Sequence, residues 1–177
     1  TDVDPVKAEV KAVRESVGIM EIAGFSKFRV SGSGAKDWLD KILACKVPKP
    51  GRMTLAPMLK EDGKLIGDLS LGCIMEGLYF LAGSGMAENY YMRWFEKHLP
   101  DDGSVMLENV GLRVCGFSIA GPNARKVLEK LTFEDVSADG FKFMAMRDME
   151  LGYAPCLVGR VSFTGDLGWE LHCRVED

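Results

Sequence analysis

The sequence predicts an α+β domain in which antiparallel hairpins are packed by helices. From residue 54 onward, short apolar or alternating runs are separated by glycine-containing turns, as in consecutive hairpins. Segments with apolar residues at helical spacing lie before, between and after these runs. The chain is 47% hydrophobic and 27% charged, which provides enough apolar surface for a folded core. This mixture of hairpins and helices favours the α+β class.

The first elements expected are a helix, a strand and a second helix. Valines recur at helical spacing over residues 6–16, and a glycine follows as a stop signal. Residues 27–31 alternate polar and apolar side chains, as in a half-buried strand. Ser33 is expected to be the N-cap of a helix that carries an apolar stripe. Residues 47–51, which contain two prolines and a glycine, are expected to end this helix.

The remaining elements follow from turn residues and apolar runs. Glu61-Asp62-Gly63 and Glu76-Gly77 are expected hairpin turns between long apolar segments. Gly121-Pro122 opens a helix because proline suits the first helical turn. The expected strands are 54–60, 65–75, 78–82, 105–108, 114–120, 141–149, 154–163 and 169–173, and the expected later helices are 86–99 and 121–131.

Charge and composition exclude several classes of protein. The formal net charge of −4 argues against a nucleic-acid-binding protein, which normally carries a basic patch. No apolar run approaches the roughly 20 residues of a membrane helix. The first residues have neither the basic flank nor the apolar core of a signal peptide. We therefore expect neither nucleic acid nor membrane as a partner.

The cysteines and histidines predict no metal site. The five cysteines are an odd number, stand far apart and form no Cys-x-x-Cys pair, so zinc and a disulfide framework are both disfavoured. Their apolar neighbours favour buried, reduced thiols and a reducing compartment. His98 and His172 are too isolated for a metal pair. Gly32-Ser33-Gly34 and Gly83-Ser84-Gly85 do not complete a dinucleotide-binding motif and are interpreted as tight turns.

Two segments could carry chemistry, and each has a purely structural alternative. Asp68 stands in the apolar run 65–71, where it is either a solvated edge position beside Gly67 or a carboxylate that faces a pocket. Residues 160–171 contain a tight excursion with two glycines. This excursion is either a hairpin with cross-strand aromatic packing or a kink that directs an aromatic ring and a carboxylate toward a flat ligand.

A family resemblance favours the functional alternatives. Ser162-Phe163-Thr164-Gly165-Asp166-Leu167-Gly168-Trp169-Glu170-Leu171 is similar to the S-Y-T-G-E-L-G-W-E-L motif of dimethylglycine and sarcosine dehydrogenases, and the glycine-cleavage T-protein carries a related G-Y-T-G-E-x-G-x-E. Residues 119–128 resemble the family segment G-V-A-G-P-x-A-R-x-V-L, and residues 25–28 and 81–85 match the dehydrogenase branch. The chain is thereby identified as a member of the T-protein superfamily of folate-binding domains, resembling most the C-terminal region of those dehydrogenases.

This resemblance implies a T-protein-like folate-binding fold. Residues 54–139 would form a ferredoxin-like lobe. Residues 1–53 and 140–177 would form a first lobe that is incomplete at its C-terminal end. In the dehydrogenases an FAD-binding module would precede this region, and a pterin-contacting arginine would follow it.

The resemblance also implies two functional carboxylates. Asp68 matches the family acid that lies near N5 and N10 of tetrahydrofolate, where a carboxylate can move protons and stabilise a cation. Glu170 matches the acid that accepts N–H bonds from the 2-amino-4-oxo edge of the pterin. Asp68 is the expected catalytic residue and Glu170 an expected ligand-binding residue.

Four further residues are implied as lining the ligand. Leu55, Tyr79 and Leu81 match family positions around the pocket. Phe163 stands where the family has tyrosine, so its ring can pack on the pterin but the hydroxyl is absent. Phe163 and Trp169 are the side chains most expected to be exposed in a fragment, where they could drive self-association.

The implied activity is one-carbon transfer in a longer protein. An N-methyl amino acid such as dimethylglycine or sarcosine would be oxidised with FAD, and tetrahydrofolate would capture the carbon. The alternatives are a stand-alone aminomethyltransferase of the glycine cleavage system, with a lipoyl-bound partner, and a non-catalytic folate-binding module. The implied location is the bacterial cytoplasm, or the mitochondrial matrix in a eukaryote.

Overall fold

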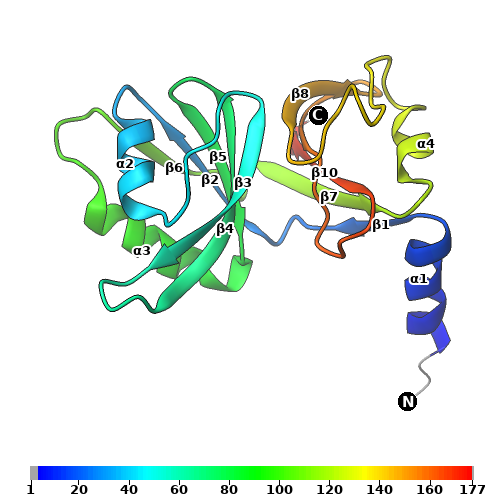
Figure 1. Ribbon diagram of the computed structural model, residues 1–177, viewed down its shortest axis with the longest axis horizontal. Coiled ribbons are helices and arrows are strands. Elements are labelled where there is room, and N and C mark those ends of the chain that lie inside the picture. Colours follow the sequence, from blue (N-terminus) through cyan, green and yellow to red (C-terminus); the bar gives the residue numbers. More distant parts are fainter. Residues whose placement is uncertain (1–3, 177) are drawn as a thin grey trace. The chain divides into compact units, whose positions relative to one another are not determined.

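The computed structural model describes residues 4–176, which form two compact units (Figure 1). One unit is continuous in sequence, Gly24–Val114. The other combines the described residues up to Ala23 with those from Cys115 onward. Each unit contains one five-stranded sheet. The expected α+β class is confirmed, because helices accompany two sheets of antiparallel strands.

The continuous unit is built on a sheet of order β3-β4-β5-β2-β6. Two helices and a short 3₁₀ turn connect its strands. Apart from β3, the order of elements is β-α-β-β-α-β, as in a ferredoxin-like unit, and β3 adds an edge strand to it. The bounds are β2 Ser26–Ser31, α2 Ala35–Ile42, β3 Arg52–Leu59, β4 Leu65–Met75, β5 Leu78–Gly83, η1 Gly85–Ala87, α3 Glu88–His98 and β6 Met106–Asn109.

The core of this unit lies between one face of the sheet and the two helices. The Phe95 ring of α3 contacts Phe28 of β2 edge-on at 5.2 Å between centroids, and Trp38 of α2 at 5.9 Å. The Trp38 Nε1 donates to the His98 carbonyl oxygen at 2.7 Å, which joins α2 to the end of α3. Both helices therefore cover the same face, which we call the inner face.

The discontinuous unit is built on a sheet of order β1-β7-β10-β9-β8. Trp169 is fully buried in its core, and the Phe141 ring contacts it edge-on at 6.3 Å. The first helix, α1, buries no residue and is joined to the unit by an ion pair of 3.0 Å between Arg14 and Asp166. The bounds are α1 Asp4–Glu15, β1 Gly18–Glu21, β7 Val114–Ala120, α4 Ala124–Leu128, β8 Met146–Leu151, β9 Ala154–Gly159 and β10 Gly168–Arg174.

Most expected elements are present, but several differ in extent. The strand expected over 141–149 begins only at Met146, because the preceding residues turn through Met144, which has a positive φ of 58°. The helix expected over 121–131 is confined to Ala124–Leu128. The N-cap of α2 is Gly34 rather than Ser33, and no side chain caps it. The short strand β1 was not predicted, since its four residues are mostly exposed.

The two units divide the chain at different points from the lobes that were predicted. The prediction assigned 1–53 and 140–177 to one lobe and 54–139 to the other. In the structure β2 pairs with both β5 and β6, so the ferredoxin-like unit begins at Gly24. β7 pairs with β1 instead, so this unit ends at Val114. Pairing between distant strands sets both boundaries.

Two of the five cysteines are not the reduced thiols that were expected. Cys156 and Cys173 are register partners on β9 and β10, with 4.4 Å between their Cα atoms, and they form a disulfide. Their juxtaposition depends on the register of two strands and is not visible from their spacing in the chain. The free thiols are Cys45, Cys73 and Cys115. Over residues 4–176, no helix combines the length and the apolar character needed to cross a membrane.

Loss of the disulfide is expected to destabilise the discontinuous unit. The bond joins residues separated by 17 positions, and a loop of this size corresponds to about 3 kcal/mol of unfolding free energy in the chain-entropy model. Urea unfolding of Cys173→Ser should show this loss when Trp169 fluorescence is followed in a Trp38→Phe/Trp94→Phe background. Dithiothreitol should abolish the difference between the variant and its parent. Equal midpoints without reductant would contradict the prediction.

Candidate functional site

Asp68 and Leu55 share the face of the ferredoxin-like sheet that the helices do not cover. Leu69 and Leu71 belong to the core, so the alternation of side chains along β4 directs Asp68 to the opposite face. We call this the outer face. Asp68 is exposed and lies opposite Pro57 of β3. Leu55 is 61% exposed on the same face, although it is a large apolar residue. An exposed carboxylate therefore lies on the same face as an exposed large apolar side chain.

A row of outer-face residues crosses the sheet next to Asp68. Leu55 lies opposite Ser70, Ser70 opposite Ala82, and Ala82 opposite Lys27. The Ser70 hydroxyl donates to the Ala82 carbonyl oxygen at 3.4 Å. The side chains of Ser70 and Ala82, in the middle of this row, are small.

Lys27 was not predicted as a site residue, yet it is completely buried. Lysine is rarely buried unless its ammonium group is satisfied. Here the Nζ atom donates to the Phe25 carbonyl oxygen at 3.0 Å. The alternation of residues 27–31 was the available signal, since Phe28 and Val30 face the core and Lys27 must then point the other way.

Tyr79 and Leu81 do not share a face with Asp68. Both side chains are buried in the core between the sheet and the helices. Burial raises the pKa of Tyr79, and the neighbouring Cys73 adds to the increase. Phe80 and Ala82 are the β5 residues that share the outer face with Asp68, although both side chains are themselves buried. An apolar run without alternation left the orientation of β5 open.

Tyr91 of α3 approaches Asp68 from the core side and was also missed. Its ring lies across Gly67, where any Cβ atom would overlap the phenol group. A Cβ atom on Gly83 would also come within 3.3 Å of the ring. Burial raises the pKa of Tyr91, and the negative charge of Asp68 adds to the increase. The two glycines thus form a slot that holds a phenol beside the candidate catalytic carboxylate.

In the discontinuous unit, Glu170 forms a buried polar pair with His172. Trp169 and Leu171 pack in the core, so Glu170 and His172 share the other face of β10. The His172 Nε2 lies 3.6 Å from Glu170 Oε2, and the two side chains are 2% and 11% exposed. A carboxylate with so little contact to water is costly unless polar groups surround it.

Small residues flank Glu170 on its sheet. Gly159 is its register partner on β9. On β7, a Cβ atom at Gly116 would lie 3.4 Å from the His172 Nδ1, which places Ser118 beside Glu170 two residues further along. The buried carboxylate of Glu170 thus lies between a glycine and a serine.

Phe163 is 83% exposed in the loop between β9 and β10. Its loop is closed by the Ser162 hydroxyl, which donates to the Asp166 carbonyl oxygen at 2.5 Å. Gly165 adopts a positive φ of 78°, as the tight excursion requires. The exposure of Phe163 agrees with expectation, whereas the expectation for Trp169 is wrong because its ring is fully buried beside Phe141.

Comparison with known proteins places this geometry in a family. A model of the GCVT N-terminal domain matches residues 2–177. The chain belongs to this family. Dimethylglycine dehydrogenase, mitochondrial, from Homo sapiens is 34% identical over 175 residues, which are 98% of this chain and 20% of that protein. Aminomethyltransferase from Geobacillus sp. (strain WCH70) is 32% identical over 174 residues, which are 97% of this chain and 47% of that protein.

A solved structure supports the same assignment at the level of the fold. The crystal structure of glycine cleavage system aminomethyltransferase T from Bartonella henselae matches with a TM-score of 0.81 at 19% identity, over 93% of this chain and 44% of that one. The chain is thus an aminomethyltransferase-type domain of T-protein fold. It spans about a fifth of the dimethylglycine dehydrogenase and about half of the aminomethyltransferase.

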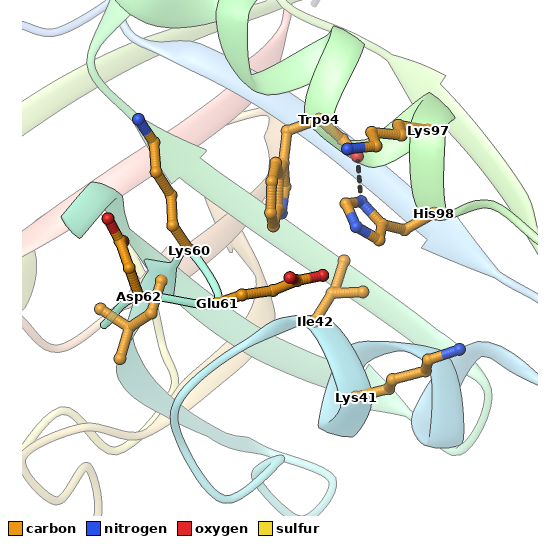
Figure 2. A pocket seen from close by; sticks show the side chains of 9 residues that line it. Lys41, Ile42, Lys60, Glu61, Asp62, Trp94, Lys97 and His98 are labelled. Carbon is orange, nitrogen blue, oxygen red and sulfur yellow. Dashed lines mark hydrogen bonds between the residues drawn. The ribbon is translucent and has the colours of Figure 1, made fainter. Parts of the chain in front are cut away.

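A pocket in this GCVT-type domain is lined by none of the candidate site residues Asp68, Leu55, Glu170 and Phe163 (Figure 2). Its volume is about 730 Å³, and it is found where the ends of α2 and α3 meet the tip of the β3–β4 hairpin. The His98 Nδ1 lies 2.8 Å from the Trp94 carbonyl oxygen, as expected for a histidine at a helix end. None of the predicted site residues lines it. The lining residues are Lys41, Ile42, Leu59, Lys60, Glu61, Asp62, Trp94, Lys97 and His98.

Gly67→Ala is expected to destabilise the ferredoxin-like unit by about 1–3 kcal/mol, because the new methyl group overlaps the Tyr91 ring. Thermal or urea unfolding measures the effect. Gly24→Ala is the matched control, since no atom lies within 4 Å of its Cβ position. Combining Gly67→Ala with Tyr91→Leu should recover part of the loss. A Gly67→Ala protein as stable as Gly24→Ala would show that the slot is not tightly packed.

Proposed function

We propose that this domain binds tetrahydrofolate and transfers a one-carbon unit to it, within a longer protein that oxidatively demethylates an N-methyl amino acid such as dimethylglycine or sarcosine. The observation that carries the proposal is the pair of carboxylates, Asp68 and Glu170, at the two positions where the family resemblance implies acids. Asp68 is exposed beside apolar side chains, and Glu170 is buried beside small ones. These two environments suit two different tasks.

Glu170 is suited to recognising the pterin edge. The 2-amino-4-oxo edge of a pterin presents adjacent N–H donors, and a carboxylate can accept both of them. Such charge-assisted bonds contribute about 1.5–3 kcal/mol each. The buried position of Glu170 reduces competition from water, and His172 beside it restricts the orientation of the carboxylate. The residues present therefore fit the proposed ligand.

Asp68 is suited to proton movement. Tetrahydrofolate would supply the N5 and N10 amines that receive the carbon. Asp68 would accept or return a proton at one of these amines and stabilise positive charge that develops beside it. Tyr91 lies on the core side of the same strand, where burial raises the pKa of its phenol and the charge of Asp68 adds to the increase.

Phe163 and the outer face would supply apolar contacts. The exposed Phe163 ring could pack on the flat pterin, although without the hydroxyl of the family tyrosine. In the ferredoxin-like unit, Leu55 is the exposed apolar residue that faces outward with Asp68 and would contact a ligand bound there. Phe80 and Ala82 share this face but are buried.

Amine oxidation would occur elsewhere in the longer protein. The dimethylglycine dehydrogenase relative extends far beyond the matched segment, and we assign the FAD-dependent step to that additional part. The alternative is a stand-alone aminomethyltransferase, which the second relative favours at 32% identity. A flavin spectrum of the full-length protein distinguishes the two.

Location and assembly follow the same proposal. A relative named as mitochondrial supports the mitochondrial matrix in a eukaryote, and a bacterial relative supports the cytoplasm in a bacterium. The exposed Phe163 could promote self-association of the isolated domain.

Glu170→Gln should weaken tetrahydrofolate binding to the full-length protein by about 1.5–3 kcal/mol, because an amide offers one acceptor oxygen in place of two. Isothermal titration calorimetry measures the dissociation constant. Glu150→Gln, at an exposed position of β8, is the matched control and should bind normally. Normal affinity in Glu170→Gln would remove this residue from the site.

Asp68→Asn should leave tetrahydrofolate affinity nearly unchanged but slow methylene-folate formation about 10²–10⁴-fold, the usual contribution of a positioned acid or base. Single-turnover kinetics with saturating folate measures the transfer step. Asp101→Asn, in an exposed turn, controls for the loss of one negative charge. If both variants transfer carbon at the parental rate, Asp68 has no catalytic role.

A further inference from the structure

Three cysteines occupy neighbouring strands of the sheet in the discontinuous unit. Cys115, Cys173 and Cys156 lie on β7, β10 and β9, which are adjacent in that order. Cys156 is the register partner of Cys173 and is joined to it. On the other side, the Cys115 Sγ donates to the Cys173 carbonyl oxygen at 3.4 Å. The central cysteine therefore has a cysteine on either side.

The register between β7 and β10 places Cys115 directly opposite Cys173. The Gly121 N–H donates to the Leu167 carbonyl oxygen at 2.8 Å, and a Cβ atom on Gly116 would lie 3.4 Å from the His172 Nδ1. From the first contact to the second, the residue number falls by five on the β7 side and rises by five on the β10 side, so the two strands are antiparallel. One step further along, residue 115 of β7 lies opposite residue 173 of β10.

All three side chains point to the same face. Cys156 belongs to the core cluster of this unit, and Cys173 packs against it. Ile119, four residues after Cys115 on the same strand, belongs to that cluster too, so Cys115 has the same orientation. Directly opposed residues have Cβ atoms about 4.5–5.5 Å apart, close to the separation that a disulfide spans. Cys173 can thus pair with either neighbour.

We propose that Cys115, Cys173 and Cys156 form a thiol–disulfide exchange site. The Cys115 thiolate attacks the Cys173 Sγ, a Cys115–Cys173 bond forms, and the Cys173–Cys156 bond breaks. Cys156 leaves as a thiolate and takes up a proton in place of the one that Cys115 lost, so there is no net oxidation. A row across three strands suits this step, because the attacking and leaving sulfurs must lie on opposite sides of the central one.

The two outer cysteines differ in their access to solvent. Cys115 is half-buried, whereas Cys156 is buried. A small thiol or disulfide from solution would therefore react first at the Cys115 end of the row. The exchange moves the covalent link of β10 from β9 to β7. Since β10 also carries Glu170, three residues before Cys173, the site connects the redox state of the surroundings to the strand that bears this carboxylate.

Disulfide mapping tests the proposal on the chain as described. The protein, in a Cys45→Ser/Cys73→Ser background, is equilibrated in a glutathione redox buffer, quenched with acid, alkylated and digested with trypsin. Cleavage after arginine separates the three cysteines into different peptides, 114–125, 148–160 and 161–174. The parent should yield both the Cys156–Cys173 and the Cys115–Cys173 linkage.

Single substitutions decide the outcome. The Cys156→Ser variant should form the Cys115–Cys173 linkage in full. The Cys115→Ser variant should retain only the Cys156–Cys173 linkage. Near-ultraviolet circular dichroism verifies that both variants are folded. If folded Cys156→Ser leaves Cys173 unlinked to Cys115, the proposal is wrong. Absence of the Cys115–Cys173 linkage from the parent would also contradict the proposal. So would a parent protein whose three cysteines stay fully reduced in the same redox buffer in which the Cys156→Ser variant forms its disulfide.

Discussion

The burial of one face of the ferredoxin-like sheet against α2 and α3 is the constraint on which the rest of that unit depends. Once Phe28, Leu69 and Leu71 are packed against the helices, every second residue of their strands must point away. Asp68 and Lys27 lie on the outer face for this reason alone. A shift of one residue in either strand would bury the carboxylate and expose the core, so the apolar contacts determine which face Asp68 occupies.

The sequence was most informative where polar and apolar residues alternate. Asp68 stands out because several residues near it in its strand are leucines, and the face to which Asp68 points could be predicted from them. The strand β5 offers no such contrast, because Tyr79, Phe80 and Leu81 are all apolar or aromatic and all buried. Its orientation depends on pairing with β4 and β2, which are long-range interactions. The face that each β5 residue occupies could not be predicted from the sequence for this reason, whereas Glu170 and Phe163 stand in a local motif.

The features that sequence analysis missed all arise from register or from contacts between distant segments. Cys156 and Cys173 are unremarkable in spacing but become opposed when β9 pairs with β10. Tyr91 reaches Gly67 only because α3 packs over the beginning of β4. The boundaries of the units likewise depend on which strands pair with β2 and β7. Local sequence patterns predict individual helices and strands, whereas the disulfide, the Tyr91 contact and the unit boundaries depend on how two elements pair or pack.

The continuous unit interrupts the discontinuous one, and this arrangement imposes an order of assembly during synthesis. All strands of the sheet that carries Asp68 have left the ribosome before β7 is complete, so that sheet can form first. β1 is made early but has no partner until β7 follows the whole insertion. The loop that must close between them is long, which makes this pairing intrinsically slow. Until then the backbone groups of β1 lack the partner strand that pairs with them in the folded unit.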